Sequence, residues 1–142
     1  VEHRWTWGQF FGSPCTDGAW FEIYRNMLVH ETDDGSLELG LGVPRAWLED
    51  GKQIEVSRAP TYFGPVSFEV NSHATAGHIT ATVKLTDSTH PRALLVRLRH
   101  PENKRLKSVT VNGKVWSNFD PAKEWVMVPN PEPGLYTIEA GY

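Results

Sequence analysis

The stretch ALLVRLRHPENKRLKSVTVNGKVWSNFDPAKEWVMV, residues 93–128, decides the fold. Its first part alternates apolar and polar side chains, so that Leu94, Val96 and Leu98 lie on one face of a strand. Asn112-Gly113 then separates two strand-like runs, and because both residues tolerate a positive φ angle they predict a type I′ hairpin turn. A further strand follows over 124–128. Strands that each have one apolar face need a second layer to cover that face, which predicts a sandwich.

The same period of two continues on both sides of this stretch. Turns of a few residues separate the runs, as in antiparallel sandwiches. The sequence therefore predicts a mainly β fold, an antiparallel β-sandwich of about eight strands that occupies residues 36–142. The further predicted inward rows are Leu37-Leu39-Leu41, Ile54-Val56, Val66-Phe68-Val70, Ile79-Ala81-Val83-Leu85 and Tyr136-Ile138-Ala140.

One segment near the N-terminus has helical periodicity instead. Thr16 or Asp17 is suited to cap its first free amides, which predicts one amphipathic α-helix over residues 18–29. The composition changes near Gly35, so we expect residues 1–35 to form an aromatic segment and a helix that pack on the sandwich or on a neighbouring domain. The predicted apolar face of the helix consists of Trp20, Ile23, Tyr24, Met27 and Leu28.

Length and composition limit the function classes. The 142 residues are enough for one domain with a sizeable core, and 39% hydrophobic with 22% charged residues is ordinary for a globular protein. A net charge of −3 gives no general attraction to nucleic acid or anionic lipid, so we expect neither as a partner. A single cysteine, Cys15, excludes an internal disulfide, and no apolar run approaches a membrane span. Since the chain opens at Val1, we expect a processed product or a piece of a longer protein.

No catalytic, cofactor or metal motif stands out. The six histidines lack metal-ligand spacing, although His73 and His78 flank a predicted hairpin turn and are placed to meet across it. Cys15 would need a histidine held against it to act as a nucleophile. We therefore expect no metal, no cofactor and no catalytic residue in this chain. The strand carboxylates Glu38, Glu55, Glu69 and Glu139 fall singly on outward positions, where we expect solvated faces rather than an acid/base pair.

The basic residues form one cluster. Basic side chains beside aromatic ones are typical of single-stranded nucleic-acid binding, but we favour a solvated strand face and loop. The cluster comprises Arg97, Arg99, His100, Lys104, Arg105 and Lys107.

Aromatic residues make up 11% of the chain and have two interpretations. Exposed rings on a sandwich stack against sugars, and such a platform would use Trp116, Phe119 and Trp125, or Tyr62 with Phe63. The interpretation that we favour is that the rings fill space between the sheets or between this domain and a neighbour. For the neighbour, the predicted interface residues are Trp5, Trp7, Phe11, Trp20 and Tyr24.

Five segments together resemble a known protein family. They are GQFFGSP at 8–14, GAWFEIYRNML at 18–28, PRAWLEDGK at 44–52, RAPTYFGP at 58–65 and VTVNGK at 109–114. The set resembles the C-terminal part of large bacterial proteins of the six-hairpin glycosidase type, in which an (α/α)6 barrel precedes a β-sandwich. No residue here matches a catalytic motif of that family, whose acid and base lie in the barrel.

The resemblance implies that residues 18–28 are the last barrel helix, separated from its partners. It implies a parent protein that acts on polysaccharide and is periplasmic or extracellular, with the catalytic barrel as this domain's partner. We accordingly expect a non-catalytic accessory domain of a glycoside hydrolase-like protein. The alternatives are a carbohydrate-binding module and a small enzyme. An unpaired helix would expose an apolar patch or hide it in a homodimer.

Overall fold

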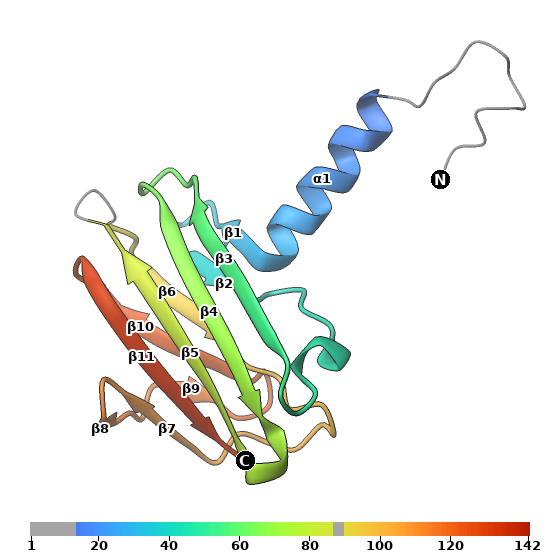
Figure 1. Ribbon diagram of the computed structural model, residues 1–142. Coiled ribbons are helices and arrows are strands. Elements are labelled where there is room, and N and C mark those ends of the chain that lie inside the picture. The colour runs from blue at the N-terminus through green and yellow to red at the C-terminus, as the bar shows by residue number, and fades with distance from the viewer. Residues whose placement is uncertain (1–13, 87–89) are drawn as a thin grey trace, which may run out of the picture.

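The computed structural model describes residues 14–86 and 90–142. Two β-sheets face one another, and the helix α1 leaves one edge of this sandwich (Figure 1). Two short 3-10 turns, η1 (Arg45–Leu48) and η2 (Ala74–Ala76), lie in the connections. The helix and strands are α1 (Pro14–Leu28), β1 (Val29–Glu31), β2 (Leu37–Leu39), β3 (Gln53–Ala59), β4 (Val66–His73), β5 (His78–Leu85), β6 (Ala93–Arg97), β7 (Ser108–Val111), β8 (Lys114–Val115), β9 (Phe119–Asp120), β10 (Trp125–Pro129) and β11 (Gly134–Gly141).

The two sheets differ in strand direction. The six-stranded sheet, β3-β4-β5-β11-β7-β8, is antiparallel throughout. The five-stranded sheet, β1-β2-β6-β10-β9, contains one parallel pair, β2 with β6. The stretch 93–128 contributes to both layers, because β6 and β10 pair in one sheet while the β7–β8 hairpin lies in the other. The predicted hairpin turn is confirmed by positive φ angles of 50° at Asn112 and 74° at Gly113.

The core consists of the inward-facing side chains, which alternate with outward-facing ones along the strands. In β4 and β5 every second side chain is buried and its neighbours face outward, as the period of two predicts. Three predicted inward residues are not fully buried. Leu41 lies in the turn after β2, and Val56 is half-buried beside an irregularity in the β3–β4 register, where Arg58 has a positive φ angle of 52°. The remaining predicted inward rows are buried, apart from a half-buried Tyr136.

The predicted fold class is confirmed: the chain is a mainly β sandwich with one N-terminal helix. The described residues form eleven strands rather than about eight. The additional ones, β1, β8 and β9, are only two or three residues long. Such short runs contain too few positions to show a period. Residues 29–31, which precede the composition change near Gly35, form the edge strand β1 of the five-stranded sheet.

The helix begins earlier than predicted. It starts at Pro14 rather than near Gly18, so the expected caps at Thr16 and Asp17 are wrong. Proline is favoured in the first helical turn, where its missing N–H has no intrahelical partner to lose. Asp17 lies in the first turn, where a negative charge complements the helix dipole. The helix ends at Leu28, and Val29 is already part of β1.

Candidate functional site

The candidate site is the part of α1 that projects from the sandwich. The helix leaves at the side where the two edge strands β1 and β3 lie, and it points away from both sheets (Figure 1). Side chains from Asp17 to Tyr24 are exposed, and only those from Arg25 to Leu28 are half-buried. An amphipathic helix normally covers its own domain with its apolar face. Here about two turns of described side chains have no part of the sandwich beneath them.

The last turn of α1 is fixed to the sandwich by backbone hydrogen bonds. The Gly40 N–H donates to Leu28 O at 2.9 Å, and the Gly42 N–H donates to Met27 O at 3.0 Å. These bonds satisfy two of the carbonyl groups that a helix end leaves free. A Cβ atom on Gly42 would lie 2.7 Å from Met27 Cγ, so this close approach requires glycine.

The Arg25 side chain adds a second anchor. Its Nη2 donates to Glu31 Oε2 at 2.7 Å and to Pro60 O at 2.9 Å, while Nη1 donates to Val29 O at 3.1 Å. The other oxygen of Glu31 accepts a hydrogen bond from the Tyr62 N–H. Charge-assisted bonds of this kind are short and directional. Arg25 therefore joins the helix to β1 and to the loop after β3, and sets the direction in which α1 projects.

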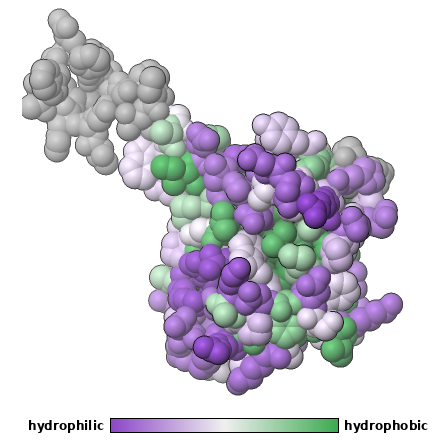
Figure 2. Space-filling view, turned by 180° about the vertical axis from the view of Figure 1, so that it is seen from behind, coloured by the Kyte–Doolittle hydropathy of each residue, from purple (hydrophilic) through white to green (hydrophobic). Residues whose placement is uncertain are grey.

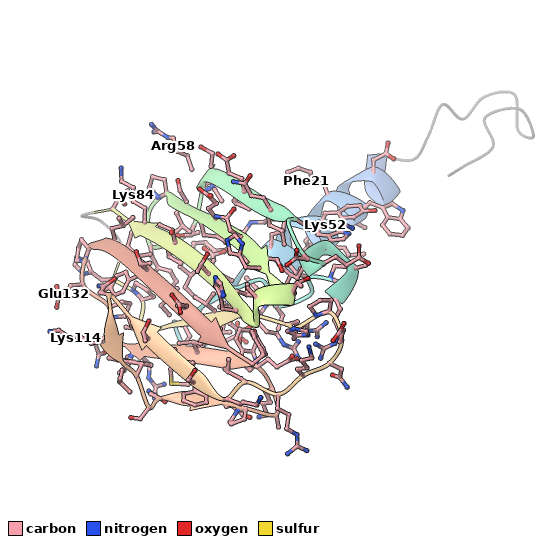
Figure 3. All side chains as sticks on the ribbon, turned by 60° about the horizontal axis from the view of Figure 1, so that its bottom comes forward. Phe21, Lys52, Arg58, Lys84, Lys114 and Glu132 are labelled. Carbon is pink, nitrogen blue, oxygen red and sulfur yellow. The ribbon has the colours of Figure 1, made fainter. Side chains whose placement is uncertain are left out.

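The projecting part of the helix is rich in large apolar side chains. Trp20, Phe21, Ile23 and Tyr24 are 53%, 75%, 50% and 54% exposed, and we call these four residues the helix patch. The rings of Trp20 and Tyr24 lie 6.1 Å apart between centroids. Figure 2 shows apolar surface on this helix, and Figure 3 shows Phe21 clear of the sandwich. Contiguous exposed apolar surface on a folded domain marks an interaction site.

Only part of the predicted interface can be placed. Trp20 and Tyr24 lie on the exposed helix, and Phe21, which the helical period places beside the predicted stripe, is the most exposed of the four patch residues. Trp5, Trp7 and Phe11 lie outside the described residues. Two more exposed aromatic residues border the β3 edge. Trp47, in η1, is 40% exposed, and Tyr62, in the loop that Arg25 contacts, is 92% exposed.

The five residues predicted for a sugar platform are in different environments. Trp116 packs on the core at the end of the β7–β8 hairpin and donates its Nε1–H to Met127 O at 2.9 Å, which ties the edge of one sheet to the other. Phe63 and Phe119 also pack on the core. Trp125 is half-buried on the outer face of β10, beneath the Arg97 guanidinium. Tyr62 alone of the five is open to solvent.

The residues of the predicted basic cluster differ in how far they are exposed to solvent. Arg105 and Lys107 are exposed, as expected for a loop, but His100 is 1% exposed and so is not part of a solvated face. Its Nδ1 accepts a hydrogen bond from the Glu102 N–H, and its Nε2 lies 3.3 Å from Ala74 O. With one ring nitrogen accepting and the other placed to donate, this histidine serves as a structural link between loops.

An ion pair between buried Glu124 and half-buried Arg45, beside His100, is the main polar feature that sequence reasoning missed. Glu124, 3% exposed, binds Arg45 through both oxygens at 2.6 and 2.8 Å, and its Oε1 also accepts from the His100 N–H. Hydrogen bonding to Glu124 raises the pKa of Arg45. The ring of Tyr142 lies 5.0 Å from that of His100, and its O–H donates to Leu98 O at 2.6 Å. Arg45 and Glu124 are 79 positions apart, so no local pattern reveals the pair.

A hollow beside His100 is bordered by carboxylates that already bind neighbouring groups. It measures about 450 Å³ and is bordered by Glu49, Asp50, Glu102 and Lys104. Glu49 pairs with Lys52 and Glu102 with Lys104, both at 2.8 Å, while Asp50 accepts from the Thr75 N–H. A general acid or nucleophile needs a polar group free to meet substrate. Each acidic group of this hollow is instead bound to a neighbour.

The prediction that His73 and His78 meet across a hairpin turn is confirmed. His73 and His78 are directly opposite each other at the β4–β5 turn, with ring centroids 4.9 Å apart. Among residues 14–86 and 90–142, no group of three or more His, Cys, Asp or Glu side chains is arranged to hold a metal ion. The predicted outward orientation of Glu38, Glu55, Glu69 and Glu139 is also confirmed, since each is exposed or half-buried. The expectation that they occur singly is wrong for Glu55 and Glu69, which lie directly opposite each other in the β3–β4 ladder.

In the part of the chain that the structure describes, no helix has the length and apolar character that crossing a bilayer requires. Searches against known proteins give no family: no family model matches the sequence, and no curated protein matches it either.

Proposed function

We propose that this chain is a non-catalytic accessory domain of a polysaccharide-degrading, glycoside hydrolase-like protein, and that α1 docks it onto the helical catalytic barrel of that parent. The observation that carries the proposal is the helix patch: four large apolar side chains stand at least half exposed on a helix whose base is fixed. The resemblance of the sequence to six-hairpin glycosidases supplies the identity of the partner.

The distribution of side chains around α1 supports a helical partner. At 100° per residue, the apolar side chains from Ala19 to Leu28 cover roughly half of the circumference or more, which is wider than the stripe of about 100° that a surface helix needs. A helix with so wide an apolar arc is suited to a groove between other helices. Burying one large apolar side chain contributes about 1.5–3 kcal/mol, so four of them provide a substantial docking energy.

The anchored base of α1 supports the same proposal. A helix that was merely a loose extension would have no need of the Arg25 bridge to Glu31 and Pro60 or of the Gly42 contact with Met27. These contacts hold the helix patch in one orientation relative to the sandwich. A pre-ordered surface loses less conformational entropy when it binds. The sandwich then serves as a rigid support beside the barrel.

A carbohydrate-binding role is the alternative. It requires two or three rings that share an open plane, and of the five predicted platform residues only Tyr62 is open to solvent. Among the predicted platform residues, the one contact that bears on sugar binding is that of the Trp125 ring with the Arg97 guanidinium. A glycan array on the purified chain tests it, since an accessory domain of the proposed kind gives no binding that depends on Tyr62.

The docking proposal is tested in two steps. The first is to read the coding sequence upstream of Val1, where we expect several helical hairpins of an (α/α)6 barrel. The second is to express the longer chain and compare Phe21→Ser/Tyr24→Ser with Leu135→Ser, which removes a similarly exposed apolar side chain from β11. We expect the helix variant to separate one thermal transition into two and the control to leave it single. Helix-free upstream sequence, or identical transitions in both variants, would overturn the proposal.

A further inference from the structure

The outer face of the five-stranded sheet contains two arginines whose charge no carboxylate neutralises. Arg97 lies at the end of β6, and Arg99 follows two positions later on the same side of the chain. In residues 14–86 and 90–142, neither guanidinium takes part in an ion pair. The two carboxylates that act most on Arg97 are those of Glu124 and Glu38. Glu124 is bound to Arg45, and Glu38 lies 3.0 Å from His30.

Both side chains are held in place by backbone carbonyl groups. Arg97 donates to Leu41 O at 2.9 Å and to Lys123 O at 3.1 Å, and Arg99 donates to Val43 O at 3.2 Å. These bonds use two of the five N–H groups of one guanidinium and one of the five of the other. Both guanidinium groups are thus held in position, while most of their N–H groups remain available to another acceptor. Fixed guanidinium groups of this kind suit the planar, two-pronged recognition of a carboxylate.

The surroundings show that the positive charge is under-compensated. Burial and the neighbouring charge of Arg99 lower the pKa of Arg97. The Nε of Arg99 is the one buried side-chain nitrogen or oxygen, among the residues that the structure describes, that has no hydrogen-bond partner. An unsatisfied buried donor is rare in native proteins and calls for an explanation such as a ligand. An anion bound at these two guanidinium groups would offset the uncompensated positive charge.

An aromatic ring lies beside the two charges. Trp125 is directly opposite Arg97 in the β6–β10 ladder, and the guanidinium carbon lies 5.4 Å from the centre of its ring. Met127, 37% exposed, continues the same outer face along β10. Flat apolar side chains next to a few placed polar groups are typical of small-ligand sites. Sugars present both kinds of surface, since their C–H faces stack on rings and acidic sugars carry a carboxylate.

We propose that Arg97 and Arg99, together with Trp125, form a binding site for the carboxylate or sulfate groups of an acidic polysaccharide. This inference goes beyond the proposed docking of α1 and does not rest on it. A polysaccharide fits better than a nucleic acid, because the chain has a net charge of −3 and the nearby Lys104 is already paired with Glu102. The site is a local pair of charges rather than an extended basic stripe.

The test is a titration of the complete 142-residue chain, labelled with ¹⁵N, and observed by NMR at the arginine Nε–H and tryptophan indole signals. The probes are short oligogalacturonates, neutral cello-oligosaccharides of the same length, inorganic sulfate and a single-stranded oligonucleotide. We expect oligogalacturonate to shift the signals of Arg97, Arg99 and Trp125, and the neutral sugar to leave them unchanged. This measurement on the unaltered chain does not depend on whether any variant folds.

Variants then test whether Arg97 and Arg99 cause the binding of the acidic sugar. Losing a hydrogen bond to a charged group corresponds to a reduction in affinity of about tenfold or more, which we expect for Arg99→Gln and Arg97→Lys. Lys114→Gln is the matched control, because it removes one exposed positive charge from β8, which lies in the other sheet (Figure 3). We expect this control to bind within about twofold of the unaltered chain, as an exposed, screened charge that takes no part in the site contributes little.

Four results would overturn the proposal. They are unchanged Arg97, Arg99 and Trp125 signals with oligogalacturonate, an equal loss of affinity in Lys114→Gln, equally tight binding of inorganic sulfate alone, and tighter binding of the oligonucleotide than of the acidic sugar. The third result would mean a simple ion site, and the fourth a nucleic-acid site.

Discussion

The Arg25 guanidinium lies 2.7 Å from the Glu31 carboxylate, six residues further along the chain, and this pair bridges the junction between α1 and β1. The same Arg25 nitrogen also reaches Pro60 O, in the loop that follows β3. One side chain thereby connects the helix to the edges of both sheets. The exposed part of α1 owes its fixed direction to this bridge and to the Gly40 and Gly42 backbone contacts.

Arg25→Ala is expected to loosen the helix without unfolding the sandwich. The carboxylate of Glu31 would lose its cation, and a partly exposed charged hydrogen bond of this kind contributes about 1 kcal/mol. We expect amide exchange in residues 18–28 to become several times faster, while exchange in β4 and β5 stays unchanged. Arg58→Ala is the control, because its side chain takes part in no ion pair among the described residues. Equal exchange in both variants would show that the bridge does not hold α1.

The isolated chain is expected to self-associate through the helix patch. Without the proposed barrel, Trp20, Phe21, Ile23 and Tyr24 have only solvent or a second copy to contact. Replacing one large apolar side chain, as in Phe21→Ser, removes about 1.5–3 kcal/mol of burial and should weaken a dimer at least about tenfold. Size-exclusion chromatography with light scattering and binding of a hydrophobic dye measure this. A monomer that binds no dye would contradict the expectation, and so would equal weakening by Leu135→Ser.

Two glycine substitutions are expected to change stability in opposite directions. Gly113→Ala puts a Cβ at a φ angle of 74° in the β7–β8 turn and should destabilise the chain by about 1 kcal/mol. Gly18→Ala lies inside α1 with nothing within 4 Å of the new Cβ, and should increase helicity because alanine is favoured over glycine by about 1 kcal/mol in a helix. Circular dichroism and urea unfolding distinguish the two. The same sign of change for both would refute this account of the turn.

Alkaline conditions are expected to weaken the fold through Tyr142. Burial raises the pKa of its phenol above the ordinary value of about 10. A group with a raised folded pKa contributes stability that is complete below its unfolded pKa and is lost as pH rises toward the folded one. The free energy of unfolding should therefore fall more steeply above pH 10 in the unaltered chain than in Tyr142→Phe. Parallel curves for the two proteins would show that Tyr142 ionises equally easily in both states.

Most of the fold could be predicted from local periodicity. The rows Val66-Phe68-Val70 and Ile79-Ala81-Val83-Leu85 are buried as predicted, and the Asn112-Gly113 turn has the predicted conformation. These features depend on neighbouring residues alone. The parallel pairing of β2 with β6 was not predicted, because partner choice between distant strands leaves no trace in the period of either strand.

The polar features of the site were harder to predict. Alternation correctly placed Arg97 and Arg99 outward, but it could not show that carbonyl groups of Leu41 and Val43 hold them, because those contacts span 56 positions. His100 was expected in a solvated loop, and it is buried because Glu102 and Ala74 satisfy both of its nitrogens. Burial of a polar group depends on such remote partners.

Amide hydrogen exchange over residues 18–28 is the most direct test of the claim that α1 is a docking element. The measurement compares the 142-residue chain, kept dilute enough to be monomeric, with the barrel-containing longer chain that the docking proposal expects. We expect these amides to be protected at least about tenfold more strongly in the longer chain, as burial of the helix patch adds more than about 1.4 kcal/mol to the cost of opening. Equal protection of residues 18–28 in the two chains would contradict the account.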